Sequence, residues 1–132
     1  LQVFMFFSSV EPRGGGTLII EGSHRLLRHF ASSLPPDEGP SDHQSVRTRF
    51  LRHDPWLRAL TGAAASPSDR PDFFMREREA SSGSLRVVEM TGEPGDVILC
   101  HPLMLHVAAQ NAGAIPRFMR SQRICTVGSA DP

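Results

Sequence analysis

Residues 94–123 read PGDVILCHPLMLHVAAQNAGAIPRFMRSQR and carry the strongest structural signal in the chain. An apolar strand-like run ends at His106, residues 110–114 contain turn formers, and a second strand-like run begins at Arg117. This pattern predicts a β-hairpin centred just after Asn111. A symmetric register about that centre places His106 opposite Arg117, on one face of the sheet and with Cβ atoms about 5 Å apart.

A histidine and an arginine on one wall have a chemical use. A neutral imidazole is a ligand for first-row metals, and a planar guanidinium binds a carboxylate with two hydrogen bonds. Strand alternation predicts that Arg120 points to the other face and that Arg123 lies roughly 20 Å further along the strand, so Arg117 is the better candidate. The alternative is structural: His106 is an ordinary wall residue of a barrel and Arg117 a solvated residue at its edge.

A second informative block opens the chain, where residues 1–25 read LQVFMFFSSVEPRGGGTLIIEGSHR. It contains an aromatic strand-like run, a glycine-rich turn and a second strand that leads into Gly-Ser-His. This block, followed later by the Pro-Gly-Asp strand, His106 and an arginine eleven residues on, resembles the phytanoyl-CoA dioxygenase family. The resemblance covers residues 1 to about 27 and 85 to about 125, and residues between these blocks match no motif.

The resemblance implies a mainly β fold, a double-stranded β-helix or jelly roll that is incomplete at the N-terminus. It also implies a dioxygenase that depends on Fe(II) and on 2-oxoglutarate as co-substrate, and that uses oxygen to hydroxylate a small-molecule or acyl substrate. In such enzymes two histidines and one carboxylate hold the iron. By match to the family, His106 is a metal ligand, Arg117 binds the far carboxylate of 2-oxoglutarate, and Phe4 is an aromatic residue that lines the pocket.

The chain departs from the family pattern at the other two ligands, because no His-x-Asp or His-x-Glu occurs anywhere in it. Ala108 also replaces the hydroxyl residue that often helps to hold 2-oxoglutarate. We therefore expect an N-terminally incomplete oxygenase whose missing part holds two iron ligands. No residue of this chain is assigned a catalytic role. A natural short protein that has lost the site is the competing explanation, and on either account the segment alone is expected to be inactive.

Two other functional classes remain open from the sequence. One is a non-catalytic jelly-roll binding module that has lost its metal. The other is an enzyme that uses His106 as a general base without metal, although no nearby acidic residue is available to orient it. The sequence leaves the substrate and the oligomeric state undetermined.

The domain organisation expected is one partial oxygenase domain, with barrel strands in 1–27, an insertion in 28–84 and C-terminal strands in 85–127. Within the insertion, Asp54 is expected to cap a short helix that starts at Pro55, and residues 62–71 are expected to form a loop. Trp56 either packs this helix onto the barrel or serves as a lid that touches substrate. Arg47, Arg49, Arg52 and Arg58 form either a cationic rim or a solvated face.

Three further residues are assigned structural roles. His24 is expected to close the turn after its strand, with a pocket role as the alternative, and His101 is expected on the strand face opposite His106 because their spacing is odd. Asp96 is expected to accept hydrogen bonds within its turn.

Composition limits the partners and the compartment. The formal net charge is zero, which favours neither nucleic acid nor an anionic membrane as a partner, and no apolar run approaches the ~20 residues of a membrane span. Cys100 and Cys125 lie in strand-like runs without metal-type spacing. They are expected to be buried free thiols in a cytoplasmic protein, with a disulfide as the alternative.

Overall fold

The computed structural model describes residues 1–35, 43–61, 78–80 and 83–125. The strands in these residues are β1 (Gln2–Phe6), β2 (Thr17–Glu21), β3 (Arg78–Ala80), β4 (Gly83–Glu89), β5 (Val97–Cys100), β6 (His106–Ala108) and β7 (Met119–Arg123). The helices are α1 (Ser23–Ser33), α2 (His43–His53) and α3 (Pro55–Thr61).

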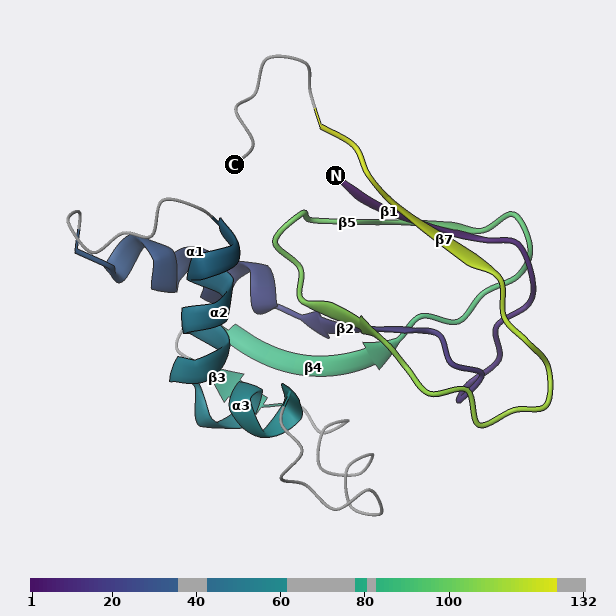
Figure 1. Cartoon of the computed structure of the whole chain (residues 1–132), viewed down its shortest axis with the longest axis horizontal. Coiled ribbons are helices and arrows are strands. Elements are labelled where there is room, and N and C mark those ends of the chain that lie inside the picture. Colours follow the sequence, from purple (N-terminus) through teal and green to yellow (C-terminus); the bar gives the residue numbers. More distant parts are fainter. Residues whose placement is uncertain (36–42, 62–77, 81–82, 126–132) are drawn as a thin grey trace.

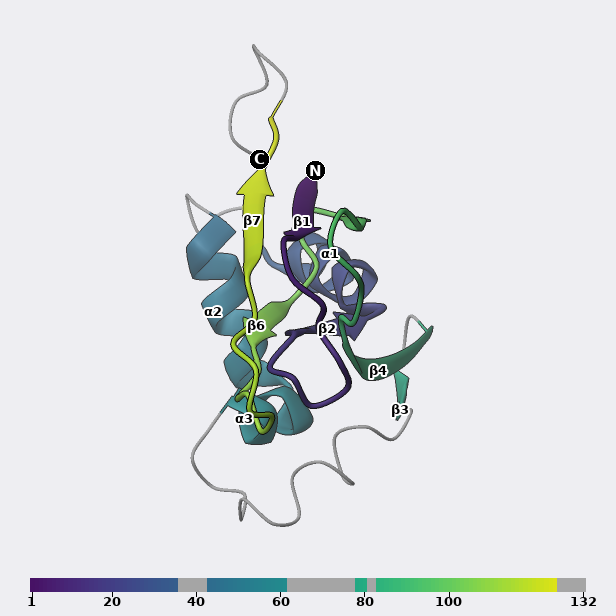
Figure 2. The same ribbon diagram turned by 90° about the vertical axis from the view of Figure 1, so that its right-hand side faces the viewer.

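The strands form two antiparallel sheets, with strand orders β5-β1-β7 and β3-β4-β2-β6. The sheets face one another in Figure 1, and β1 and β7 run side by side in Figures 1 and 2. An apolar cluster fills the space between the sheets: Phe4 and Phe6 of β1 pack with Met90 and Cys100, and Ile19 of β2 and Met119 of β7 pack against them. The predicted mainly β, jelly-roll-like architecture is confirmed.

The predicted hairpin of residues 94–123 is wrong. β6 pairs with β2, so that His106 lies opposite Ile19, whereas β7 pairs with β1, so that Met119 lies opposite Phe6. The residues between β6 and β7 therefore cross from one sheet to the other. The run from Val97 to His106, predicted as one strand, forms two strands, β5 and β6, which belong to different sheets. The choice of partner depends on which sheet buries the apolar face of each strand.

The glycine-rich turn between β1 and β2 supports this crossing. Gly15 has φ +80°, and a Cβ atom there would lie 2.8 Å from the Cβ of Asn111, in the segment that leaves β6. The carboxylate of Glu89 accepts the backbone N–H groups of Arg13 at 2.7 Å and of Gly16 at 3.0 Å. Close approach of the backbone and a left-handed conformation thus both require glycine in this turn.

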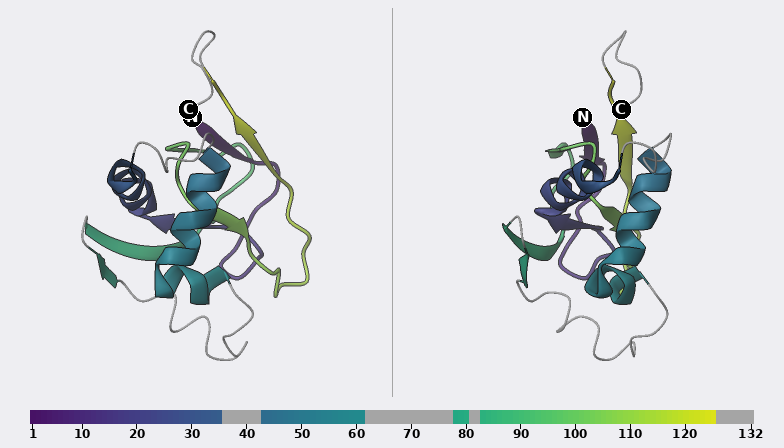
Figure 3. Two further views of the ribbon diagram at one scale, coloured as in Figure 1. Left: turned by 60° about the vertical axis from the view of Figure 1, so that its left-hand side comes forward. Right: turned by 90° about the vertical axis from the view of Figure 1, so that its left-hand side faces the viewer.

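Three helices cover the other face of the second sheet. Leu26 and Leu27 of α1 and Trp56 of α3 pack in one cluster with Ile20 of β2 and Val87 of β4. Figure 3 shows α1 and α2 crossing steeply beside the strands. Trp56 is buried in this cluster, which agrees with the packing role predicted for it.

The short helix predicted at Pro55 is confirmed, together with its cap. The Asp54 carboxylate accepts the backbone N–H groups of Trp56 at 2.8 Å and of Leu57 at 3.0 Å. α1 was not predicted: Gly22 turns the chain at φ +83°, and His24 then lies in the first helical turn instead of closing a turn after the strand. The loop predicted at residues 62–71 lies outside the described residues.

Candidate functional site

His106 is held in an orientation that suits a metal ligand. Its Nδ1 atom lies 3.0 Å from the backbone carbonyl oxygen of Met104. A carbonyl oxygen only accepts hydrogen bonds, so Nδ1 carries the proton and the lone pair of the imidazole is on Nε2. Metal-binding histidines commonly have this arrangement, in which a backbone carbonyl fixes the tautomer and the ring orientation. The residue fits the ligand role that the sequence suggested.

Phe4 and His106 meet across the two sheets. Their ring centroids lie 5.3 Å apart with an interplanar angle of 80°, so one ring edge faces the other ring. Phe4 is only 2% exposed, and Ile19, which lies opposite His106, packs against the same cluster as Phe4. His106 therefore faces the interior between the sheets, with the aromatic ring of Phe4 as part of its wall.

The Gly-Ser-His block positions the chain just before His106. The Ser23 side chain is fully buried, and its Oγ atom accepts the backbone N–H of Leu105 at 3.0 Å. Leu105 also accepts, through its carbonyl oxygen, the backbone N–H of Ile20 at 3.0 Å. Ser23 and β2 thus hold both backbone polar groups of the residue before His106. Sequence reasoning recognised the block but assigned no role to Ser23, since its partner lies 82 residues away.

Arg117 lies in the extended segment that enters β7. Arg117 and Met119 are half-buried, whereas Phe118 between them is 64% exposed, so alternation places the Arg117 side chain toward the inner side with Met119. Arg117 and His106 do not occupy opposite positions of one hairpin, because His106 lies in β6 of the second sheet and Arg117 precedes β7 of the first. A role of Arg117 at the candidate site stays a prediction.

The other arginines of this region lie where alternation predicted. Arg120 is exposed and pairs with Met5, on the other face of β7 from Met119. Arg123 pairs with Gln2 at the far end of the strand.

Thr17 is a polar residue of the inner wall that sequence reasoning did not single out. It lies directly opposite Ala108 in the β2–β6 register, two positions from the pair of Ile19 and His106. Opposed residues share a face, and so do residues two apart, which places Thr17 on the same face as His106. Thr17 is 7% exposed. A buried hydroxyl group therefore lies beside the position where Ala108 lacks one.

His24 and His101 form a second histidine pair, which is separate from His106. Their rings stack with centroids 5.0 Å apart. Burial, followed by the charges of His101, Arg25 and Arg28, lowers the pKa of His24 from 6.5. His101 lies in the turn between β5 and β6, not on one strand with His106, so the alternation argument for its face does not apply.

Two minor predictions have clear outcomes. The Asp96 carboxylate accepts the backbone N–H of Glu93 at 2.8 Å, which confirms its role in the turn. Both cysteines are free thiols, as expected, but Cys125 is exposed and only Cys100 is buried. Burial raises the pKa of the Cys100 thiol.

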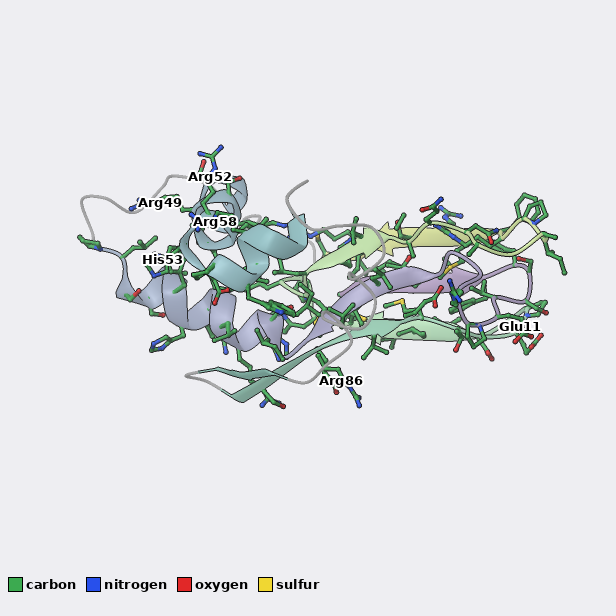
Figure 4. All side chains as sticks on the ribbon, turned by 90° about the horizontal axis from the view of Figure 1, so that it is seen from below. Glu11, Arg49, Arg52, His53, Arg58 and Arg86 are labelled. Atoms are coloured by element: carbon green, nitrogen blue, oxygen red, sulfur yellow. The ribbon has the colours of Figure 1, made fainter. Side chains whose placement is uncertain are left out.

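The predicted cationic cluster lies on the helical side of the molecule. Arg49 and Arg52 of α2 and Arg58 of α3 are labelled in Figure 4. Glu11 and Arg86 lie elsewhere in the same view, and Arg86 forms an exposed ion pair with Glu21 at 2.9 Å. Whether the α2–α3 arginines form a binding rim stays a prediction.

The described part of the chain does not complete a metal centre. It contains no group of three or more His, Cys, Asp or Glu side chains that could hold a metal ion. Within the same residues, none of the helices has the length and apolar character needed to cross a bilayer. Of the metal-binding set implied by the sequence, the structure thus contains His106 alone among the residues described.

Two facing antiparallel sheets, with His106 on the inner face of one of them, define a jelly-roll-like fold. The family model of phytanoyl-CoA dioxygenase (PhyH) matches residues 1–119. The chain belongs to this family, whose members are dioxygenase-type oxidoreductases that generally depend on Fe(II) and 2-oxoglutarate. Comparisons with curated proteins and with solved structures found no match.

Proposed function

We propose that this chain is the C-terminal part of an Fe(II)- and 2-oxoglutarate-dependent dioxygenase that hydroxylates a small-molecule or acyl substrate in the cytoplasm. The observation that supports the proposal most directly is the fixed tautomer of His106, whose Nδ1 faces the Met104 carbonyl and whose Nε2 is left to bind a metal. Family membership supplies the reaction type.

His106 would supply one ligand of the iron. When bound, Fe(II) would supply the redox chemistry with oxygen and 2-oxoglutarate. The other histidine and the carboxylate would come from a His-x-Asp pair, which these 132 residues lack. We therefore propose that the 132 residues by themselves bind iron weakly and do not turn over, since a single imidazole does not hold Fe(II).

The remaining residues of the inner wall would bind and orient the co-substrate. Arg117 would donate two hydrogen bonds from its guanidinium to the far carboxylate of 2-oxoglutarate. Thr17 would donate a hydrogen bond from its hydroxyl group to the same co-substrate, in the place of the hydroxyl residue that Ala108 replaces. Phe4 would keep water away from the His106 side of the metal, because its ring packs edge-on against the imidazole.

The second candidate is a jelly-roll binding module without metal. The missing His-x-Asp motif favours it, since the chain keeps the two sheets and one histidine but not the rest of the ligand set. The inner faces of the sheets would then bind a small molecule without redox chemistry.

The decisive experiment uses the protein extended by the coding sequence that precedes Leu1. Succinate formation from 2-oxoglutarate is measured with and without Fe(II), in the unchanged protein and in His106→Ala and Arg117→Ala. Arg120→Ala is the matched control, because Arg120 is exposed on the other face of β7. The proposal expects iron-dependent turnover that both inner-wall variants abolish and the control keeps. An extended protein that lacks a His-x-Asp motif and forms no succinate would favour the binding module.

A further inference from the structure

A basic cavity lies on the α1 side of the molecule. It has a volume of about 560 Å³ and is lined by side chains of α1 and of the turn that follows β5: His24, Arg25, Arg28, His29, Ser32 and His101. α1 lies at the end of the sheets in Figure 1. None of the inner-wall residues Phe4, Thr17, His106 and Arg117 lines this cavity.

The lining groups are rich in hydrogen-bond donors and contain no carboxylate. The backbone N–H of Leu103 donates to Nδ1 of His101 at 3.1 Å, so the ring proton of neutral His101 is on Nε2 and available to donate. Arg25 and Arg28 are exposed, and neither guanidinium has an ion pair within the described part of the chain. A cavity that offers donors and positive charge is suited to an anion.

His24 gives a second indication of a missing hydrogen-bond partner in this cavity. Its Nδ1 atom is buried without a hydrogen-bond partner, the one such side-chain atom found among the described residues. The ring stacks on His101, and Arg25 and Arg28 add positive charge around it. An anion in the cavity would offset the positive charge of Arg25 and Arg28.

A smaller apolar cavity of about 300 Å³ adjoins the basic one. The two cavities share Arg28 and Ser32, and the smaller one is otherwise lined by the apolar residues Leu27, Ala31, Val46 and Leu103. A ligand that spans both would therefore need a charged head and a short apolar chain.

We propose that α1 and the turn after β5 form a binding site for an oxyanion that carries a short apolar chain, either a phosphate monoester or a carboxylate. Arg25, Arg28 and the Nε2–H of His101 bind the head group, and Leu27, Val46 and Leu103 contact the chain. The site uses neither iron nor 2-oxoglutarate, so it does not depend on the dioxygenase function proposed above.

The test is isothermal titration calorimetry on the iron-free protein with hexyl phosphate, hexanoate, inorganic phosphate and hexanol. We expect hexyl phosphate or hexanoate to bind more tightly than inorganic phosphate and than hexanol, because only these two probes fill both cavities. The tighter of the two identifies the head group that the site prefers. In the double variant Arg25→Gln/Arg28→Gln, the dissociation constant for the alkyl anion should rise about tenfold or more, because charge-assisted hydrogen bonds are lost.

Two further variants make the test specific. Arg120→Gln removes an exposed arginine from β7 and should leave binding unchanged. Ala31→Trp fills the apolar cavity from the exposed side of α1. It should weaken the binding of hexyl phosphate without changing the binding of inorganic phosphate. Equal losses in Arg120→Gln and in the double variant, hexanol binding as tight as that of the alkyl anions, or no binding of any probe would each overturn the proposal.

Discussion

At the scale of single residues, Ser23 links the Gly-Ser-His block to the candidate metal ligand. Its hydroxyl oxygen accepts the N–H of Leu105, the residue before His106, in a fully buried position. Removing a buried acceptor leaves the donor without a partner, which costs more than the hydrogen bond itself contributes. The serine therefore affects both stability and the placement of His106.

We predict that Ser23→Ala lowers the free energy of unfolding by about 1–3 kcal/mol, the cost of a buried unsatisfied N–H group. Urea denaturation followed by circular dichroism measures this loss. Ser33→Ala is the matched control, because Ser33 is exposed and its hydroxyl donates only to the nearby Phe30 carbonyl. Equal stability of the two variants would contradict the role assigned to Ser23.

The hydroxyl group of Thr17 is predicted to contribute to co-substrate binding. In the extended, iron-loaded protein, Thr17→Val should raise the dissociation constant for 2-oxoglutarate about three- to tenfold, since one neutral hydrogen bond contributes about 1 kcal/mol. The shape of the side chain is kept, so the fold should not change. Thr17→Ser should restore most of the affinity. Unchanged 2-oxoglutarate binding in Thr17→Val would show that the hydroxyl does not reach the co-substrate.

His24 makes stability depend on pH. Its pKa is lowered in the folded protein, first by burial and then by His101, Arg25 and Arg28, so folding favours the neutral ring. The stabilisation is complete above the unfolded value of about 6.5 and is lost as pH falls through the lower folded value. We predict that His24→Gln flattens the fall in melting temperature below pH 6.5. His29→Gln, on the exposed side of α1, is the control and should leave the pH profile unchanged.

At the scale of elements, the sequence predicted features that depend on neighbouring residues but did not predict which strands pair. α3 begins where Pro55 and Asp54 predicted, because a cap depends on residues two and three positions apart. The run from Val97 to His106, predicted as one strand, forms β5 and β6 of different sheets, and the predicted pairing of His106 with the start of β7 in one hairpin was wrong. The apolar faces of β6 and β7 are buried against different strands, and the turn formers between them serve a crossing between sheets instead of a tight turn.

The cap of α3 can be tested directly. Asp54→Ala should reduce the free energy of unfolding by about 1 kcal/mol, the usual cost of losing an N-cap, whereas Asp54→Asn should reduce it by less because asparagine also caps helices. Thermal unfolding of both variants at pH 7 measures the difference. Similar melting temperatures for Asp54→Ala and the unchanged protein would contradict a contribution of the cap to stability.

At the scale of the whole molecule, the candidate iron site and the proposed anion site use different side chains. Ile19 and His106 face the first sheet, while Ile20 and Val87 face the helices. The basic cavity is lined by α1 and by the turn that follows β5, and none of its lining residues is Phe4, Thr17, His106 or Arg117. Substitution of Arg25 and Arg28 therefore changes no side chain of the candidate iron site.

The metal prediction belongs to this scale because it depends on the complete ligand set. Co(II), used as a redox-stable substitute for Fe(II), should raise the melting temperature of the extended protein, since a ligand that binds only the folded state stabilises it. It should not raise the melting temperature of the 132 residues alone, nor of the extended protein with His106→Ala. An equal rise in the 132 residues would contradict the need for ligands outside them.

By itself, the amino-acid sequence determined β1, β2, the glycine-rich turn, the Asp54 cap and the family, because periodicity, turn chemistry and short motifs depend on neighbouring residues. It also singled out His106, Arg117 and Phe4, and the structure places Phe4 against His106. Only the tertiary structure decided which strands pair, which histidine meets His24, and that Ser23 binds Leu105. These contacts join residues roughly 80 positions apart, and burial of apolar faces across the whole molecule selects them.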